Sequence, residues 1–475
     1  MRRINTLPRL LSKAKNENIW CWLSFGTGVI ATAVCLYPGF LDFDSFDQLL
    51  QARSLSIDPL RPPASIVLTY LWHFTDLILP GPGGIFLINT FFFWIGLFGI
   101  SVLECKSKLH AALAPLLVAS FLPIFLSLAV VGKDLSFISS LLLSASLLNK
   151  NERSFDSRYW GGALLALGYS SAMRPNAIFA TIPFLFWAAF QWCKRDQARK
   201  RSLIQATVVL LSLFLLTIFG ANRLAKYPTS GFASRVLLTY DIVGVSARKN
   251  VNLLPDFINH AVPALRHDEV LDLYTASSSL PVFWAPPPVR RLPRAQNAEE
   301  MSELSSAWRS AVFKYPAAYL AHRTAVFSNL MGFYDLSFQP RWSPEPYWKV
   351  RPYYWVTPEE PDFSRHANSG LRRKMMGFVD GHLNSVLFRP WFYLLFFIFA
   401  SGAMLCSKDA QDKGTKLYLV LMGSVICYQG SYFWIAPGMD FRYSWWLMTV
   451  TALLLVLLGL RTVDIWKKSP RRIQG

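Results

Sequence analysis

Apolar runs long enough to cross a membrane as helices dominate the sequence. A membrane helix needs about 20 predominantly apolar residues, and about ten runs or shorter pieces approach this pattern. We therefore expect an all-α polytopic membrane protein with about ten transmembrane helices. The runs are 19–37, 84–103, 111–131, 135–148, 160–173, 177–192, 203–221, 386–405, 417–435 and 445–460.

The distribution of charge predicts the orientation of these runs. Only 16% of the residues are charged, although the net charge is +19. About 15 of those positive charges fall in the segments that we assign to the cytoplasm, as the positive-inside rule expects. Both termini are therefore expected in the cytoplasm. The segments that we assign to the outer side and the membrane are nearly neutral together. They offer no basic surface, so we expect no nucleic-acid partner.

The polar stretches divide the chain into three expected parts. Residues 1–222 form an N-terminal transmembrane module, and its first outer loop spans 38–83. Residues 223–385 form a large extracytoplasmic domain, rich in Pro and aromatic residues. Residues 386–475 form a C-terminal transmembrane module.

Two further apolar segments, 62–79 and 311–331, contain ionisable residues. If the first one spanned the membrane, the Gly-rich turn after it would face the cytoplasm and the later loops would invert. We therefore expect both segments to lie on the outer side as interfacial or re-entrant helices.

Three acidic residues, Asp42, Asp44 and Asp47, stand directly after the first run. At helical spacing, Asp44 and Asp47 share one face. One interpretation is that the acids cap a short amphipathic helix over 46–53. The other is that a carboxylate at the membrane surface takes a proton from an acceptor hydroxyl or binds a divalent cation.

Arg61 lies in the same outer loop, after Asp58 and before two prolines. A Pro pair is typical of a helix start, because the missing N–H groups would have no partner there anyway. The alternative interpretation adds a function for Arg61, because the planar guanidinium suits a phosphate group.

Other ionisable residues stand at the outer ends or breaks of later runs. Lys133 and Asp134 lie between two runs, and Arg174 and Asn176 lie at the break between two short ones. We expect this break within the membrane, where ionisable residues usually line a polar cavity. A surface ion pair and a snorkelling arginine are the structural alternatives.

The last run opens with Asp440, Arg442 and Tyr443, again on the outer side. Cations and carboxylates from distant parts of the chain are therefore expected at one membrane face. This pattern favours an anionic, membrane-borne substrate such as a lipid-linked phosphate. The cations would hold the phosphate while an acid handles a hydroxyl group.

The chain resembles the multi-span GT-C glycosyltransferases, and most closely a bacterial branch known as GtrII-like or RgtA/B/C/D-like. This superfamily includes the protein O-mannosyltransferases and the lipid A aminoarabinose transferase. The resemblance implies a GT-C-like fold and sugar transfer from a polyprenyl-phosphate donor. It rests on the segments YPGFLDFDSFDQL followed by RPP, VVGKDLS, SSAMRPNAIFA and GMDFRYSWWL.

The resemblance also implies roles for individual residues. Asp44 matches the catalytic base of the first outer loop, with Asp42, Asp47 and Asp58 as candidates for binding the acceptor or a metal. The branch often has His before Pro-Pro, where this chain has Arg61. Lys133, Arg174 and Arg442 match basic positions that would hold the donor phosphate, and Arg61 is a further candidate from the chemistry of its guanidinium alone. Asp134, Asn176, Asp440 and Tyr443 are the supporting candidates.

No cofactor is certain from the resemblance, and a divalent cation (Mg²⁺ or Mn²⁺) held by Asp42 and Asp44 is an open alternative. The implied partners are a polyprenyl-phosphate-linked sugar, membrane lipids, and a glycan, lipid or protein acceptor in the cell envelope. The implied location is the bacterial inner membrane, with the active site on the periplasmic face. A flippase for lipid-linked sugars and a structural membrane protein are the alternatives.

Overall fold

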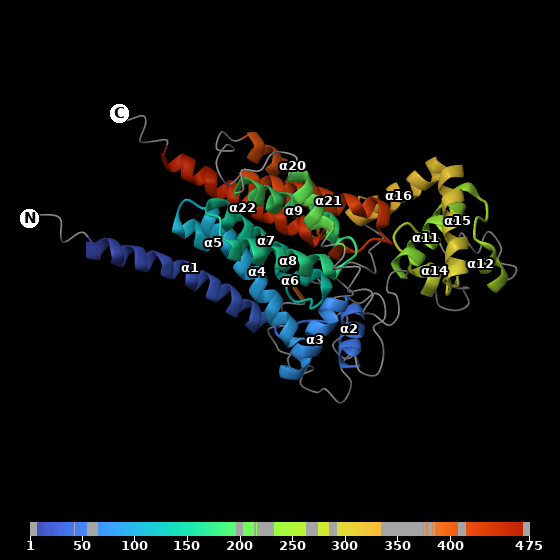
Figure 1. The fold of residues 1–475 in the computed structure, drawn as a ribbon, viewed down its shortest axis with the longest axis horizontal. Coiled ribbons are helices and arrows are strands. Elements are labelled where there is room, and N and C mark those ends of the chain that lie inside the picture. The colour runs from blue at the N-terminus through green and yellow to red at the C-terminus, as the bar shows by residue number, and fades with distance from the viewer. Residues whose placement is uncertain are drawn as a thin grey trace, which may run out of the picture.

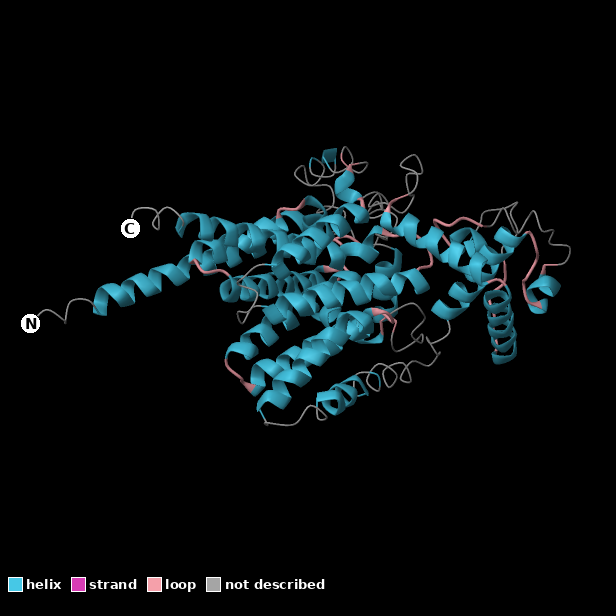
Figure 2. Cartoon of the chain, turned by 90° about the horizontal axis from the view of Figure 1, so that it is seen from above, coloured by secondary structure: helices cyan, strands magenta, loops and turns pink. Residues whose placement is uncertain are grey.

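The computed structural model describes residues 7–41, 43–54, 65–195, 203–212, 215, 232–262, 274–284, 292–333, 374, 377–378, 382, 385–406 and 415–468. Within these ranges every regular element is a helix, accompanied by two isolated β-bridges. The expectation of an all-α chain is confirmed for the described residues. Figures 1 and 2 show an elongated bundle of helices with a smaller helical group at one end.

The bundle combines helices from the N-terminal and C-terminal parts of the chain (Figure 1). Two shorter helices, α2 (Phe43–Arg53) and α3 (Ile66–Ile78), lie at its end. The bundle helices are α1 (Leu7–Leu36), α4 (Gly83–Glu104), α5 (Lys108–Ala119), α6 (Leu122–Ser127), α7 (Lys133–Arg153), α8 (Ser157–Met173), α9 (Ala177–Arg195), α20 (Pro390–Cys406), α21 (Thr415–Ile435) and α22 (Trp445–Lys468).

The smaller group, which we call the outer domain, comes from the polar middle of the chain. Its helices pack beyond the end of the bundle that carries α2, and α16 connects the two parts (Figure 1). They are α11 (Phe232–Lys249), α12 (Asp256–Ala261), α14 (Leu280–Trp284), α15 (Ala298–Lys314) and α16 (Pro316–Met331).

The expected count of about ten spans is not supported. In the described part of the chain, three helices are long and apolar enough to cross a membrane: Gly83–Glu104, Ala177–Lys194 and Phe441–Asp464. Several other bundle helices are short or carry many polar residues. In α7, for example, serines are buried against neighbouring helices, so its sequence lacks a continuous apolar surface.

The expected run 111–131 is divided into two helices. α5 ends at Ala119, and α6 begins at Leu122 after a turn at Ser120 and Phe121. Pro123 near the start of α6 lacks the N–H that a continuous helix would need there. The chain then leaves α6 through a turn at 128–129, pairs Val130 with Phe40 in an isolated bridge, and reaches α7 at Lys133.

The two short runs around Arg174 form a helical hairpin. α8 ends at Met173 and α9 begins at Ala177, so the predicted break at 174–176 is confirmed. The helices pack against each other, and both also pack against α7. The break is therefore a turn between two adjacent helices, at the same end of the bundle as Asp134.

A buried carboxylate, that of Glu104, joins three helices at the end of the bundle opposite Asp134. Glu104 of α4 accepts hydrogen bonds from Asn149 at 3.0 Å and Arg153 at 3.1 Å, and forms an ion pair with Arg461 at 3.3 Å. Its side chain is only 1% exposed. Because a buried charge needs partners, this cluster fixes α4, α7 and α22 relative to one another.

α16 covers most of the segment 311–331, which is expected to lie at the outer membrane interface. The segment is interrupted at Tyr315, where α15 ends and α16 begins. His322 and Arg323 are fully buried, and both face Asp241 of α11. These polar residues therefore stabilise the interior of the outer domain, and burial lowers the pKa of His322.

The close packing of α4 on α7 depends on Gly96. A Cβ atom at this position would lie 2.7 Å from the backbone carbonyl carbon of Leu142, whereas a Cβ at Gly168 in α8 would meet nothing within 4 Å. We expect Gly96→Ala to lower the thermal unfolding midpoint of the purified protein, because two buried backbones must separate. Gly168→Ala is the matched control and should keep or raise the midpoint, because Ala favours helix. Equal midpoints for the two variants would contradict this packing.

Candidate functional site

A backbone contact brings the first outer loop to the start of α7. Phe40 N donates to Ala129 O at 2.6 Å, and Val131 N donates to Phe40 O at 2.9 Å. Gly132 follows, and a Cβ there would lie only 2.4 Å from the Ser45 hydroxyl of α2. Gly132 therefore leaves room for the Ser45 hydroxyl where the N-terminal ends of α2 and α7 meet.

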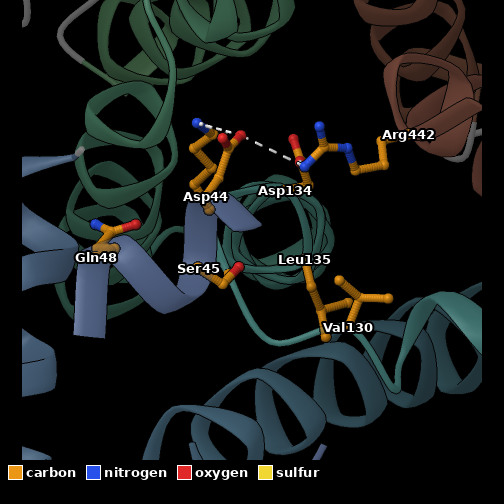
Figure 3. A pocket seen from close by; sticks show the side chains of 9 residues that line it. Asp44, Ser45, Gln48, Val130, Asp134, Leu135 and Arg442 are labelled. Carbon is orange, nitrogen blue, oxygen red and sulfur yellow. Dashed lines mark ion pairs between the residues drawn. The ribbon is translucent and has the colours of Figure 1, made fainter. Parts of the chain in front are cut away.

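Asp44 is placed by this contact between two cations. Its Oδ2 lies 3.1 Å from Lys133 Nζ and 3.6 Å from Arg442 Nη1. Figure 3 shows Asp44 and Arg442 pointing toward each other from opposite sides of a pocket. The pocket is lined by Asp44, Ser45, Gln48, Val130, Gly132, Lys133, Asp134, Leu135 and Arg442.

Asp134 is the more deeply buried acid, with a side chain 8% exposed. It lies in the first turn of α7, where the helix dipole stabilises a carboxylate. Its Oδ1 lies 2.6 Å from Arg174 Nη1, and its Oδ2 lies 3.7 Å from Arg442 Nη1. Asp134 therefore joins the α8–α9 turn to the segment before α22.

Asp440 fixes the orientation of Arg442. Its carboxylate caps the short 3₁₀ helix η5 (Phe441–Ser444), accepting from the Arg442 backbone N–H at 3.0 Å. The same carboxylate accepts from Arg442 Nε at 2.8 Å and Nη2 at 2.6 Å. Such a forked pairing defines a guanidinium in both position and orientation. Arg442 Nη1 is thereby directed toward Asp44 and Asp134.

Aromatic rings lie beneath the charged groups. The Arg174 guanidinium is 4.8 Å from the ring centre of Tyr443 and donates to the Tyr432 hydroxyl at 3.1 Å. The rings of Tyr432 and Tyr443 are stacked, with centroids 4.7 Å apart. Tyr428 and Phe137 continue this contact toward the middle of the bundle, with ring centroids 4.8 Å apart.

The electrostatic surroundings keep Asp44 ionised. Burial by itself would raise the pKa of its carboxyl group, but Lys133 and Arg442 act in the opposite direction and lower the pKa well below its ordinary value. The side chain remains 30% exposed. Asp44 is therefore a charged and partly accessible acceptor of hydrogen bonds.

The structure thus brings together Asp44, Lys133, Asp134, Arg174 and Arg442, which the sequence placed at one membrane face. Asp440 and Tyr443 also support this site, as described above. Arg174 pairs with Asp134 and is not among the residues that line the pocket. Of the predicted phosphate-binding residues that the structure describes, Lys133 and Arg442 are therefore the two that line the pocket.

Other predicted residues have different surroundings. Asp47 accepts a hydrogen bond from Gln51 at 2.7 Å within α2, and it does not line the pocket. Asn176 lies in the α8–α9 turn, and its buried amide nitrogen has no hydrogen-bond partner among the described residues. The candidates Asp42, Asp58 and Arg61 lie outside the described residues.

The sequence did not indicate two residues that shape the site. Gln48 donates to Ser65 O at 2.9 Å and so fixes α2 against the start of α3. Tyr432 holds Arg174, but in the sequence it is one aromatic residue within an apolar run. The recurrence of tyrosines at Tyr428 and Tyr432, four residues apart, is the only signal that marks one helix face there.

The described residues do not form an evident metal site. No group of three or more His, Cys, Asp or Glu side chains in this part of the chain is arranged to hold an ion. Two cations already face the Asp44 carboxylate, and their charge opposes a divalent ion at that position. The geometry favours an anionic ligand between Lys133 and Arg442.

No protein-family model and no curated protein matches the chain. Among solved structures, the chain is similar to archaeal oligosaccharyltransferase AglB from Archaeoglobus fulgidus in complex with an inhibitory peptide and a dolichol-phosphate. The similarity has a TM-score of 0.39 and 12% sequence identity, and it covers 96% of this chain and 52% of that chain. The chain therefore spans about half the length of that structure. A similarity of this strength does not establish a shared fold.

Asp44 should contribute to stability in a pH-dependent way. Because its pKa is lowered in the folded protein, its ionised form stabilises the fold above the unfolded pKa, and this stabilisation is lost as the pH falls through the folded pKa. We expect Asp44→Asn to cost about 1–3 kcal/mol at neutral pH. Thermal unfolding should show a lower midpoint at pH 7, and a difference from wild type that shrinks below about pH 4.

Asp47→Asn is the matched control for this measurement. Asp47 lies on the same helix and has no ion pair with Lys133 or Arg442 among the described contacts. It should therefore have a smaller effect at neutral pH. A midpoint difference for Asp44→Asn that stays constant between about pH 7 and pH 3 would contradict the ion pairing.

Proposed function

We propose that the protein is a membrane glycosyltransferase that moves a sugar from a polyprenyl-phosphate donor to a hydroxyl group of a cell-envelope acceptor. The observation that carries this proposal is the convergence of Asp44, Lys133 and Arg442 at one pocket. Two cations are suited to a phosphate, and the partly exposed carboxylate between them is suited to a hydroxyl proton.

The reaction replaces one bond at the sugar with another. The acceptor oxygen forms a bond to the anomeric carbon, and the bond from that carbon to the phosphate oxygen breaks. Its electron pair stays on the polyprenyl phosphate, which leaves as an anion. Asp44 takes the proton of the acceptor hydroxyl. Lys133 and Arg442 stabilise the charge that develops on the departing phosphate.

Donor binding also changes the basicity of Asp44 in this proposal. Without donor, Lys133 and Arg442 pair with the Asp44 carboxylate and lower its pKa. A donor phosphate competes for the same two cations, so their hold on Asp44 weakens. The pKa of Asp44 then rises toward its ordinary value, which makes the carboxylate a stronger base when the substrate is present.

Arg174 does not contact the phosphate and acts through Asp134. It neutralises Asp134 at 2.6 Å, while Arg442 lies farther from that carboxylate, at 3.7 Å. With Asp134 compensated by Arg174, Arg442 keeps donor capacity for the phosphate. Lys133 and Arg442 are thus the direct phosphate ligands, and Arg174 and Asp440 maintain the charge and orientation that these two require.

The variant Asp44→Asn tests donor binding and sugar transfer separately. The variant removes the carboxylate that competes for Lys133 and Arg442, so we expect it to bind polyprenyl monophosphate as tightly as wild type or more tightly. Sugar transfer should fall by about 10²–10⁴, because the base is lost. The measurements are lipid binding and turnover of a labelled polyprenyl-phosphate sugar by purified protein in nanodiscs.

Asp47→Asn, on the same helix, should retain turnover and serves as the control. Full activity of Asp44→Asn would remove the assignment of Asp44 as the base. Lipid translocation in vesicles without sugar transfer would instead favour a flippase, which needs the cations but no base.

We also propose that the site faces the periplasm from the bacterial inner membrane, with both termini in the cytoplasm. In support, Cys21 of α1 lies against Lys108, and Asp464 of α22 lies 3.3 Å from His110, so these parts of the first and last helices share the end opposite the site. A reporter fused after Gly83 should read extracytoplasmic. A cytoplasmic reading would place the site on the other side of the membrane.

A further inference from the structure

The outer domain contacts the segment that carries Arg442 through its backbone. Ser279 N donates to Pro437 O at 2.8 Å, and Met439 N donates to Ser277 O at 2.7 Å. The two short segments therefore run antiparallel, in the manner of paired strands. The pairing lies immediately before Asp440 and Arg442 in the chain.

Gly438 is at the centre of this pairing, opposite Ser278. A Cβ atom at Gly438 would lie 2.8 Å from both the Ser277 carbonyl oxygen and the Ser278 Cα. Both neighbours are backbone atoms, so neither can rotate away. The φ angle of +155° is also one that residues with a side chain rarely adopt. The contact therefore depends on glycine.

A second contact from the outer domain holds the same segment. Arg323 of α16 donates to Ala436 O at 2.9 Å. Its guanidinium also pairs with Asp241 of α11 and is fully buried. A buried arginine with a carboxylate partner has a defined position, so it anchors the chain just before Gly438.

The restraint is passed on over a few residues. Ala436, Pro437 and Met439 are each hydrogen-bonded to the outer domain. Asp440 follows directly in the chain, and its carboxylate accepts hydrogen bonds from the backbone N–H and the guanidinium of Arg442. No freely rotating segment separates the outer domain from the side chain that faces Asp44.

We propose that the outer domain positions Arg442 for phosphate binding, through the pairing of Ser277–Ser279 with Pro437–Met439. The positioning residues touch no substrate, and they act through Arg442. The proposal rests on the phosphate-binding role given to Arg442 above. It assigns the outer domain a part in donor binding at a pocket whose described lining residues all come from other parts of the chain.

The test is a double-mutant cycle on polyprenyl monophosphate binding by full-length protein in nanodiscs. Gly438→Ala should weaken binding roughly tenfold, the loss expected for one charge-assisted hydrogen bond. Arg442→Gln should weaken it at least as much. The double variant should bind no more weakly than Arg442→Gln alone, because both changes remove the same contribution.

Two further variants complete the design. Gly430→Ala is the matched control, because a Cβ there in α21 meets nothing within 4 Å, and it should bind like wild type. Ser279→Pro removes the donor to Pro437 O from the outer-domain side. It should reproduce the loss seen with Gly438→Ala, and its effect should also vanish in the Arg442→Gln background.

The outcomes distinguish this proposal from the proposed function. The positioning role would be overturned if the double variant bound the lipid more weakly than Arg442→Gln alone, or if Gly438→Ala bound it like wild type. Either result would leave the phosphate site intact. Unfolding of both Gly438→Ala and Ser279→Pro would also overturn it, because the pairing would then support the whole fold. Failure of wild-type protein to bind the lipid phosphate would overturn the phosphate site itself.

Discussion

The buried carboxylate of Asp134 is the constraint around which the charged end of the bundle is organised. An acid removed from water at a helix start requires cationic partners, and those partners come from distant parts of the chain. Arg174 reaches it from the α8–α9 turn and Arg442 from the segment before α22. Because Arg442 also faces Asp44, satisfying Asp134 fixes the geometry of the pocket.

Much of this site could be predicted from the sequence, because ionisable residues beside apolar runs are costly to bury without partners and so gather at the ends of the helices. Asp44, Lys133 and Arg442 were each expected at the ends of such runs, and they do meet. Which of the charged residues would line the pocket, and which would pair behind it, could not be predicted. That Arg174 would pair behind the pocket depends on the side-by-side packing of α8 and α9 against α7.

The fold was less predictable than the site. Hydropathy alone treated 111–131 as one span, whereas a turn at Ser120 and Phe121, followed by Pro123 in the first turn of α6, divides it into two helices. Hydropathy also gives no direction for the ionisable residues of 311–331, and in the structure Arg323 turns inward to Asp241. In both places tertiary partners, which a single sequence does not reveal, decide whether a segment continues or where its charge points.

The aromatic stack beneath Arg174 has a consequence for traffic across the membrane. Below Tyr432 and Tyr443, the rings of Tyr428, Phe137 and Trp446 are packed and buried. A hydrated phosphate head group travelling from the pocket toward the opposite end would have to displace these rings and give up its ionic partners. In the proposed function, a lipid-linked anion would therefore dock above this closed stack of rings and depart on the side on which it arrived.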